Sequence, residues 1–285
     1  MRCKFINAEK ARNNTSRLCA LFGISRSGFY AWRSRPSSRR AREDVVLLSH
    51  IQTEFEASHR SYGRPRMVEE LRELGFKVGH TRIGRLMREN GIVAVRTRKF
   101  KRTTNSNHSY GFAPNILEQN FSASKPNEKW SVDISYIQTR QGWLYLAVVL
   151  DLHSRRIVGW SVSDRMKRDL ALRALQMAIT LRRPEPGLIH HSDRGSQYCS
   201  TQYQMLLKRH GMIASMSDKG NCYDNAPVEA FFKTIKAELI WRMKFETRND
   251  AERKIFGYIN DFYNPRRRHS ALGNISPAAY EKLAA

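Results

Sequence analysis

The sequence has few of the features that mark membrane, secreted or zinc-binding proteins. No apolar run approaches the roughly 20 residues that a transmembrane helix requires, and no charged-then-apolar signal segment opens the chain. The four cysteines are scattered and lack the close Cys or His neighbours of a zinc site. We therefore expect a soluble cytoplasmic protein with reduced cysteines and no membrane partner.

Acidic residues are also scarce. The chain has 50 Lys and Arg against 26 Asp and Glu in 285 residues, which gives a formal net charge of +24. Because phosphate neutralisation by basic side chains dominates nucleic-acid affinity, this imbalance predicts a nucleic-acid partner rather than a merely solubilising surface. The length accommodates one large domain and one or two small ones.

Helical patterns occupy the amino-terminal third of the chain. Residues 15–32 predict two short helices separated by Gly23, with Ser25 capping the second, which is typical of a helix-turn-helix. A plain helical hairpin is the alternative. We assign residues 1–40 to this segment and predict Arg26 as a DNA contact.

A second helical domain is predicted over residues 43–95. Its first helix starts at Glu43 with an apolar stripe from Val45 to Phe55, and two more helices end before Gly75 and Gly91. We expect it to bind DNA through Arg64, Arg82 and Arg85, the alternative being an amphipathic helix with a solvated basic face. Residues 96–124 predict a basic linker that follows a DNA backbone, through Arg98, Lys99, Lys101 and Arg102.

From Trp130 the pattern changes to strands. Residues 130–138, 143–151 and 157–162 are rich in β-branched and aromatic residues and are separated by short turns. Helices at 169–181 and 201–210 then alternate with short strands at 188–190 and 212–216. Three antiparallel strands followed by alternating elements predict an α/β domain over residues 125–285, with a mixed five-stranded sheet flanked by helices.

Three acids stand out within this domain. Asp133 lies on the first strand, Asp193 follows the fourth, and Glu229 lies in the first turns of a helix, with 35 residues between the last two acids. If the first and fourth strands are neighbours, the acids meet at one end of the sheet. Mg²⁺ takes a few carboxylate ligands plus substrate phosphate, so the set predicts a phosphoryl-transfer site, although any single acid is more often a solvated surface residue.

Basic residues surround this predicted site. Lys233 and Lys236 share a helical face with Glu229, and Lys219 lies in the preceding loop. We predict DNA contacts for Lys219 and Lys233 and for the tail arginines Arg266, Arg267 and Arg268, which are equally compatible with a solvated turn. His190 and His191 are adjacent on a strand and point to opposite faces, which favours structural roles over joint metal binding.

Several motifs resemble one family. Three of them are similar to the signatures of DDE transposases with an integrase catalytic core, namely Trp130-x-x-Asp133, His191-Ser192-Asp193-x-Gly195 and Asp224-Asn225-Ala226-x-x-Glu229. Two others resemble the second-frame product (OrfB) of bacterial insertion sequences whose transposase is encoded in two frames, namely Tyr62-Gly63-x-Pro65-Arg66 and Tyr263-Asn264-x-x-Arg267-x-His269. The resemblance spans nearly the whole chain.

The resemblance implies a ribonuclease-H-like core and Mg²⁺ or Mn²⁺ as cofactor, with two ions in each site. It implies that Asp133, Asp193 and Glu229 form the metal-binding catalytic triad, with Lys236 as a basic companion. The implied partners are double-stranded DNA, as terminal inverted repeats and target, a second copy of the chain in a homodimer or higher oligomer, and the first-frame protein, fused or separate. The chain has no sustained heptads and therefore no leucine zipper of its own.

The expected function is metal-dependent cleavage of element ends followed by strand transfer. One alternative is a structure-selective nuclease on the same sheet that hydrolyses DNA without joining it. The other is a DNA-binding regulator with an inactive core. The two predicted basic helical units favour recognition of specific ends, and the three acids together favour catalysis.

Overall fold

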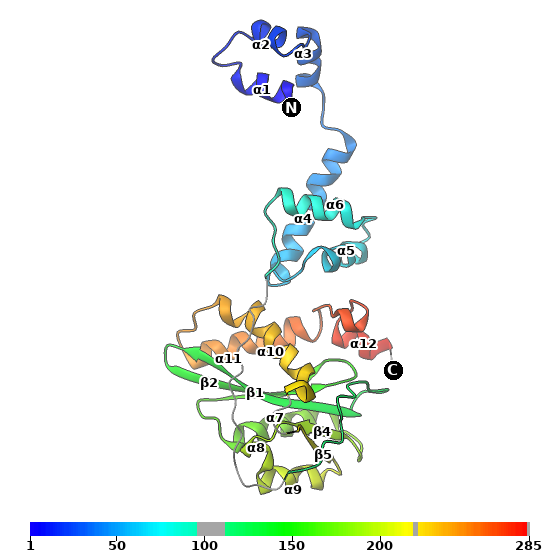
Figure 1. Ribbon diagram of the computed structural model, residues 1–285, viewed down its shortest axis with the longest axis vertical. Helices are drawn as coiled ribbons and strands as arrows, with labels where there is room; N and C mark the ends of the chain where they lie inside the picture. Colours follow the sequence, from blue (N-terminus) through cyan, green and yellow to red (C-terminus); the bar gives the residue numbers. More distant parts are fainter. Residues whose placement is uncertain (96–111, 219–221, 284–285) are drawn as a thin grey trace. The chain divides into compact units, whose positions relative to one another are not determined.

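The computed structural model describes residues 1–95, 112–218 and 222–283 (Figure 1). The chain forms two compact units, Met1–Ile51 and Gln52–Ala285, each described here by itself. Among the helices that the structure describes, none is long and apolar enough to cross a membrane.

The first unit contains the pair of helices predicted for residues 15–32. Helix α2 (Thr15–Leu21) ends at a turn in which Gly23 has a φ of +64°, and the Ser25 hydroxyl accepts a 3.0 Å hydrogen bond from Gly28 N to cap α3 (Arg26–Ser34). Helix α1 (Arg2–Glu9), which the sequence pattern did not indicate, adds Ile6 to a core that contains Phe29. The predicted pair of helices is therefore present, with a third helix packed on it.

Helix α4 (Arg39–Ala57) is continuous across the predicted boundary near residues 40–43, and the first compact unit ends within it, at Ile51. It buries Leu47, Ile51 and Phe55, which follow one another at intervals of four residues. The prediction that Val45 begins the buried stripe is wrong, because this side chain is 70% exposed.

Helices α5 (Arg64–Glu73) and α6 (His80–Glu89) pack on each other, as the sequence predicts. Pro65 stands in the first turn of α5, where its missing N–H has no helical partner to lose. Each helix buries one apolar stripe, and the basic side chains lie outside it. The buried residues are Met67, Val68 and Leu71 in α5 and Ile83, Leu86 and Met87 in α6.

Residues 129–216 contain the predicted mixed five-stranded sheet. Its strands are β1 (Lys129–Thr139), β2 (Gly142–Asp151), β3 (Ile157–Ser163), β4 (Ile189–Ser192) and β5 (Ile213–Met216). Their order is β3-β2-β1-β4-β5, in which the β1–β2 and β2–β3 pairs are antiparallel and the β1–β4 and β4–β5 pairs are parallel. The first and fourth strands are therefore neighbours.

Helices cover both faces of the sheet (Figure 1). On one face lie α7 (Arg168–Arg182), α8 (Ser196–Cys199) and α9 (Thr201–Arg209), whose apolar residues join Trp130 and Val132 in the main core. Helix α7 crosses β3 closely, since a Cβ on Gly159 would lie 2.3 Å from the Ala174 carbonyl oxygen. The other face carries η1 (Cys222–Asn225), α10 (Ala226–Glu238) and η2 (Ile240–Arg242), followed by the carboxy-terminal elements.

The carboxy-terminal elements are α11 (Arg248–Gly257), η3 (Tyr258–Tyr263), η4 (Ser270–Leu272) and α12 (Pro277–Leu283). The single helix predicted for residues 250–263 is divided, because its last six residues form a π-helical turn. Directly after this turn, the buried Asn264 amide accepts from Ile157 N and donates to Ile157 O, both at 2.9 Å. The tail is thereby fixed to the start of β3.

Residues 112–124 are not the end of an extended linker. Ile116 N and Leu117 N donate to the Ser215 hydroxyl at 3.0 and 3.1 Å, and the Leu117 side chain is only 1% exposed. Lys129 Nζ also donates to the carbonyl oxygens of Asn120 and Ser122. Burial of Leu117 and these bonds make the segment part of the core, which corrects the predicted linker boundary at residue 124.

Candidate active site

The pairing of β1 with β4 places two of the predicted acids side by side. The parallel register matches Lys129 with Ile189 and Ser131 with His191. Continued by two residues, the same register sets Asp133 opposite Asp193, at the point where β4 has ended and β1 continues, paired with β2 on its other side. Both side chains are half-buried at this open end of the sheet.

The third acid, Glu229, is brought to the same place by the start of α10. The buried Asn225, which precedes α10, donates to the Val132 carbonyl oxygen at 2.9 Å and accepts a short hydrogen bond from the Ser131 hydroxyl. These contacts hold the first turn of α10 against β1, one residue from Asp133. Glu229 follows within that turn.

Asp224 serves as a second anchor for α10. Its carboxylate accepts bonds from Asp218 N at 2.8 Å, from the Asn115 amide at 3.1 Å and from the Gln119 amide at 2.9 Å. The side chain is 1% exposed, so these bonds replace water as its hydrogen-bond partner. The Asp224-Asn225 pair therefore positions Glu229 rather than taking part in chemistry itself, a role that the linear motif did not reveal.

The three acids interact electrostatically. Burial, together with the neighbouring carboxylates of Asp193 and Glu229, raises the pKa of Asp133 well above its usual range. Hydrogen bonding from Ile134 N at 2.7 Å and the positive charge of Lys236 act in the opposite direction. A divalent cation among the acids would remove the repulsion that opposes ionisation of Asp133.

Asp193 and Glu229 each have a local partner. Asp193 Oδ1 accepts from Gly195 N at 2.9 Å, and a Cβ on Gly195 would lie equally close to this oxygen. Glu229 Oε2 lies 3.4 Å from the Lys233 ammonium, one helical turn away, in a pair whose side chains are 34% and 49% exposed. This exposed pair is weak, so Lys233 is easily drawn away by a phosphate.

The acids are near one another without being closed into a ligand cage. Among the described residues, no group of three or more His, Cys, Asp and Glu side chains is gathered tightly enough to hold a metal ion. The donor chemistry fits Mg²⁺ or Mn²⁺, which take carboxylate oxygens and complete their coordination with water and phosphate. We regard the arrangement as three hard oxygen donors converging on one end of the sheet.

Lys236 lies two helical turns after Glu229 and is 7% exposed. Burial lowers the pKa of its ammonium, while the negative charge of Asp133 raises it. The same ammonium lies 5.3 Å from the ring centroid of Tyr136. Lys236 therefore connects the acidic site with the surface around Tyr136.

The two histidines have the structural roles that the sequence predicts. His190 Nε2 is 3.0 Å from the Tyr203 hydroxyl, and burial lowers the pKa of this imidazole to about 3. His191 is within hydrogen-bonding distance of the hydroxyls of Ser215 and Ser217, and burial lowers its pKa to about 4. Both side chains are neutral core residues at neutral pH.

The predicted DNA-contacting residues fall into three groups. Those with exposed or half-buried side chains are Arg26, Arg64, Arg82, Arg85, Lys233 and Arg266. Of these, Arg85 pairs with Glu89 at 2.8 Å and Arg266 with Glu54 at 3.7 Å. Five others lie outside the described residues: Arg98, Lys99, Lys101, Arg102 and Lys219.

The remaining two, Arg267 and Arg268, are used inside the fold. Arg267 is 5% exposed and makes paired hydrogen bonds of 2.7 to 3.1 Å to Glu238 at the end of α10. Arg268, equally buried, bonds Glu70 at 2.6 Å and Glu73 at 2.9 Å. The prediction of DNA contacts is wrong for these two, because their guanidinium groups already have carboxylate partners and little exposed surface.

Family models match the region of helices α4 to α6 and the region of the sheet separately. An HTH-like domain matches residues 41–100, and an integrase core domain matches residues 123–222, with a second integrase core model over residues 210–277. A mixed sheet with one acid on β1 and another directly after β4, preceded by basic helices, thus defines an integrase-core protein with an HTH-like region.

Similar proteins identify the family more closely. The chain is 45% identical to an uncharacterized 31 kDa protein of insertion element IS600 from Shigella sonnei, over 93% of this chain and 97% of that one. It is 43% identical to transposase InsF for insertion sequence IS3A from Escherichia coli (strain K12), over 99% and 98% of the two chains. The chain belongs to this family of insertion-sequence transposases.

A solved structure resembles the chain more distantly. The structure is the trimeric form of the HTLV-2 integrase catalytic core domain in complex with magnesium. The match covers 55% of this chain and 97% of the integrase chain, at 15% identity and a TM-score of 0.43. The family assignment rests on the sequence relatives and confirms the resemblance noted from the motifs.

Proposed function

We propose that this transposase cuts DNA at the ends of its element and joins them to a target at the site formed by Asp133, Asp193 and Glu229. The observation that supports this assignment most strongly is the parallel pairing of β1 with β4, whose register, continued by two residues, sets Asp133 opposite Asp193. The raised pKa of Asp133 supports it further, because a pKa perturbed by burial and by neighbouring carboxylates is more common at functional sites than elsewhere.

The three carboxylates would hold Mg²⁺ or Mn²⁺, as two ions. Such ions activate an attacking oxygen and stabilise the leaving oxygen of a phosphodiester. The protein's own contribution is positional: Asn225 and Asp224 fix the start of α10, and Lys233 and Lys236 offer positive charge to the DNA strand. The first cut uses water as nucleophile, and the joining step uses the freed 3′-hydroxyl, so no covalent enzyme intermediate is required.

Double-stranded DNA is the proposed partner, as the ends of the element and as target. The exposed Arg26, Arg64 and Arg266 would contribute backbone contacts that are independent of sequence. Joining two ends in one event requires at least two active sites, so a homodimer or larger assembly on DNA is proposed. A first-frame protein, fused or separate, would complete the assembly.

The test compares wild type with Asp193→Asn on labelled DNA carrying the element's ends, with Mg²⁺ or Mn²⁺. We expect the substitution to reduce cleavage and joining by at least about a thousandfold, because several kcal/mol of transition-state stabilisation are lost. Calcium, which occupies oxygen sites, provides a condition for measuring binding alone.

Asp169→Asn is the matched control, since it removes an exposed carboxylate (64%) from the first turn of α7. Full activity of Asp193→Asn would refute the assignment. Cutting without joining would indicate a nuclease, and binding without either step, also in a fusion with the first-frame protein, would indicate a regulator.

A further inference from the structure

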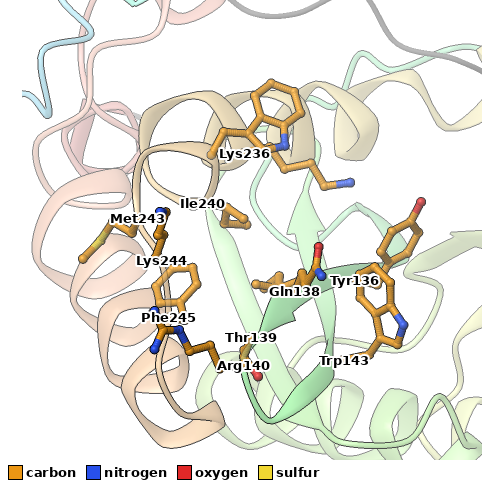
Figure 2. Close-up of a pocket in the computed structure, with 12 residues that line it drawn as sticks. Tyr136, Gln138, Thr139, Arg140, Trp143, Lys236, Ile240, Met243, Lys244 and Phe245 are labelled. Atoms are coloured by element: carbon orange, nitrogen blue, oxygen red, sulfur yellow. The ribbon is translucent and has the colours of Figure 1, made fainter.

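A pocket of about 530 Å³ lies beside Lys236, at the end of the β1–β2 hairpin. The hairpin forms one side, and the segment that follows α10 forms the other. Thr139 pairs with Phe245, and Arg140 N donates to the Phe245 carbonyl oxygen at 3.0 Å, which joins the two sides. Figure 2 shows Tyr136 and Trp143 on one side of the pocket and Met243 and Lys244 on the other.

Large aromatic side chains are exposed around this pocket. Tyr136 and Trp143 are each 46% exposed, and their rings meet edge to face with centroids 5.2 Å apart. Trp241, from η2, is 37% exposed. Exposed aromatic rings around one concavity offer stacking surfaces to a flat ligand.

The charge around the pocket is positive. Arg140, Lys236 and Lys244 line it, and among the described lining residues none is acidic. Glu246 lies nearby and pairs with Arg140 at 3.1 Å, but both side chains are more than half exposed, so the pair is weak. A ligand that is both flat and anionic therefore fits the pocket, and a nucleotide combines these properties.

The position of the pocket further limits the class of ligand that it could bind. Lys236, which lines it, is on the same helix as Glu229, and its charge interacts with that of Asp133. The pocket is therefore adjacent to the proposed cleavage site. Bases within a duplex are stacked and cannot enter a side pocket, whereas an unpaired base exposes its flat face.

We propose that the pocket binds an unpaired base of the DNA strand next to the reacting phosphate, by stacking on Trp143 and Trp241. This proposal rests on the proposed function, which places the reacting phosphate among the three acids. Arg140 and Lys244 hold the backbone of the same strand. The pocket thus draws frayed or single-stranded ends toward the catalytic carboxylates.

The test uses the full chain and duplex DNA with a short single-stranded extension that carries a fluorescent adenine analogue, quenched when it stacks. Calcium replaces the catalytic ion, so binding is measured without chemistry. The variant is Trp143→Leu combined with Trp241→Leu. The matched control is Phe256→Leu, which removes another exposed aromatic ring (53%) from α11, outside the pocket.

We expect the double variant to lose the quenching and to bind extended DNA at least about tenfold more weakly, with unchanged binding of blunt duplex. The control should behave as wild type. Unchanged quenching would overturn the proposal, as would an equal loss for blunt and extended DNA. A change in sedimenting mass without a change in DNA binding would identify a protein contact instead and would also overturn it.

Two further measurements distinguish a folding defect from a loss of base binding, and the pocket from the catalytic site. Trp241→Leu alone, whose folding is checked by circular dichroism, gives the same answer if the double variant does not fold. Cleavage by wild type compared with Asp193→Asn reports separately on the catalytic site. A protein that stacks the base yet never cuts DNA would refute the proposed function and leave the pocket as a single-strand site.

Discussion

Helix α10 carries two acids whose surroundings are opposite. Glu229, at its start, lies near the carboxylate of Asp133, whose pKa it helps to raise. Glu238, at its end, is 7% exposed and accepts bonds from the Arg267 guanidinium and from the Tyr258 hydroxyl at 2.6 Å. The comparison separates two settings of a carboxylate: Glu238 is paired within the fold, whereas Glu229 lies near other carboxylates and helps to raise the pKa of one of them.

The largest effect on stability is expected at the carboxy-terminal end of α10, where Glu238 is paired with Arg267. Arg267→Met would leave the Glu238 carboxylate buried without its cation, which should lower the free energy of unfolding by about 3–5 kcal/mol. Urea unfolding followed by circular dichroism measures the change.

Lys125→Met is the matched control, because it removes a cation from an exposed pair with Glu185 (67% and 84% exposed). Its effect should stay below about 1 kcal/mol. If both substitutions cost the same, burial of the Arg267–Glu238 pair has no special importance and the comparison between the two ends of α10 fails.

At the other end of α10, the carboxylates of Asp133, Asp193 and Glu229 should destabilise the metal-free protein as the pH rises. With a raised pKa, Asp133 keeps a proton in the folded state that the unfolded chain releases near pH 4. Between these two values the folded protein binds more protons, so its stability falls as the pH rises. The loss is about 1.4 kcal/mol for each unit by which the pKa is raised.

Asp133→Asn should abolish this part of the pH dependence and make the metal-free protein more stable than wild type at neutral pH. Mg²⁺ should stabilise wild type and not the variant, because only wild type retains the full donor set. Thermal unfolding between pH 4 and 8, with and without Mg²⁺, measures both effects. Asp151, whose pKa burial also raises, contributes equally to both proteins and cancels in the difference. A wild-type slope that persists in Asp133→Asn would contradict this explanation.

Sequence patterns could predict the acids but not the use of the arginines. Strand alternation and the order of elements placed Asp133 on a strand and Asp193 directly after one, and the structure shows these two strands to be neighbours. Arg266, Arg267 and Arg268 look alike in the sequence. Their difference depends on Glu238 and Glu70, which are distant along the chain and meet them only in the folded protein.

Tertiary contacts that the sequence does not reveal also explain two other features that were not predicted. Residues 112–124 contain apolar residues such as Ile116 and Leu117 but no sustained strand or helix periodicity, so the sequence does not indicate that the segment packs against β5. The pocket beside Lys236 combines Tyr136 and Trp143 from a hairpin with Trp241 from a segment after α10. Such a site depends on tertiary contacts, and each aromatic residue taken singly fits an ordinary strand or helix.

The smallest effect is expected from Asn225, the residue that anchors the start of α10 to β1. Its substitution should affect catalysis as well as stability, unlike that of a comparable buried asparagine elsewhere. Asn225 and Asn264 are both buried asparagines that bond the backbone of a strand, Asn225 beside the acids and Asn264 at the start of β3. Replacing either by Ala leaves buried polar groups unpaired and should cost about 1–3 kcal/mol of stability.

Only Asn225→Ala should also affect chemistry. It frees the first turn of α10 from β1, so Glu229 is displaced from Asp133 and Asp193, whereas Asn264→Ala leaves this turn in place. Cleavage rates measured well below the melting temperature of each variant, where both are folded, distinguish the two. We expect Asn225→Ala to cut DNA at least about tenfold more slowly than Asn264→Ala, since small displacements of catalytic groups carry large costs in rate. Equal rates would mean that Glu229 is positioned by the body of α10 and not by its anchored first turn.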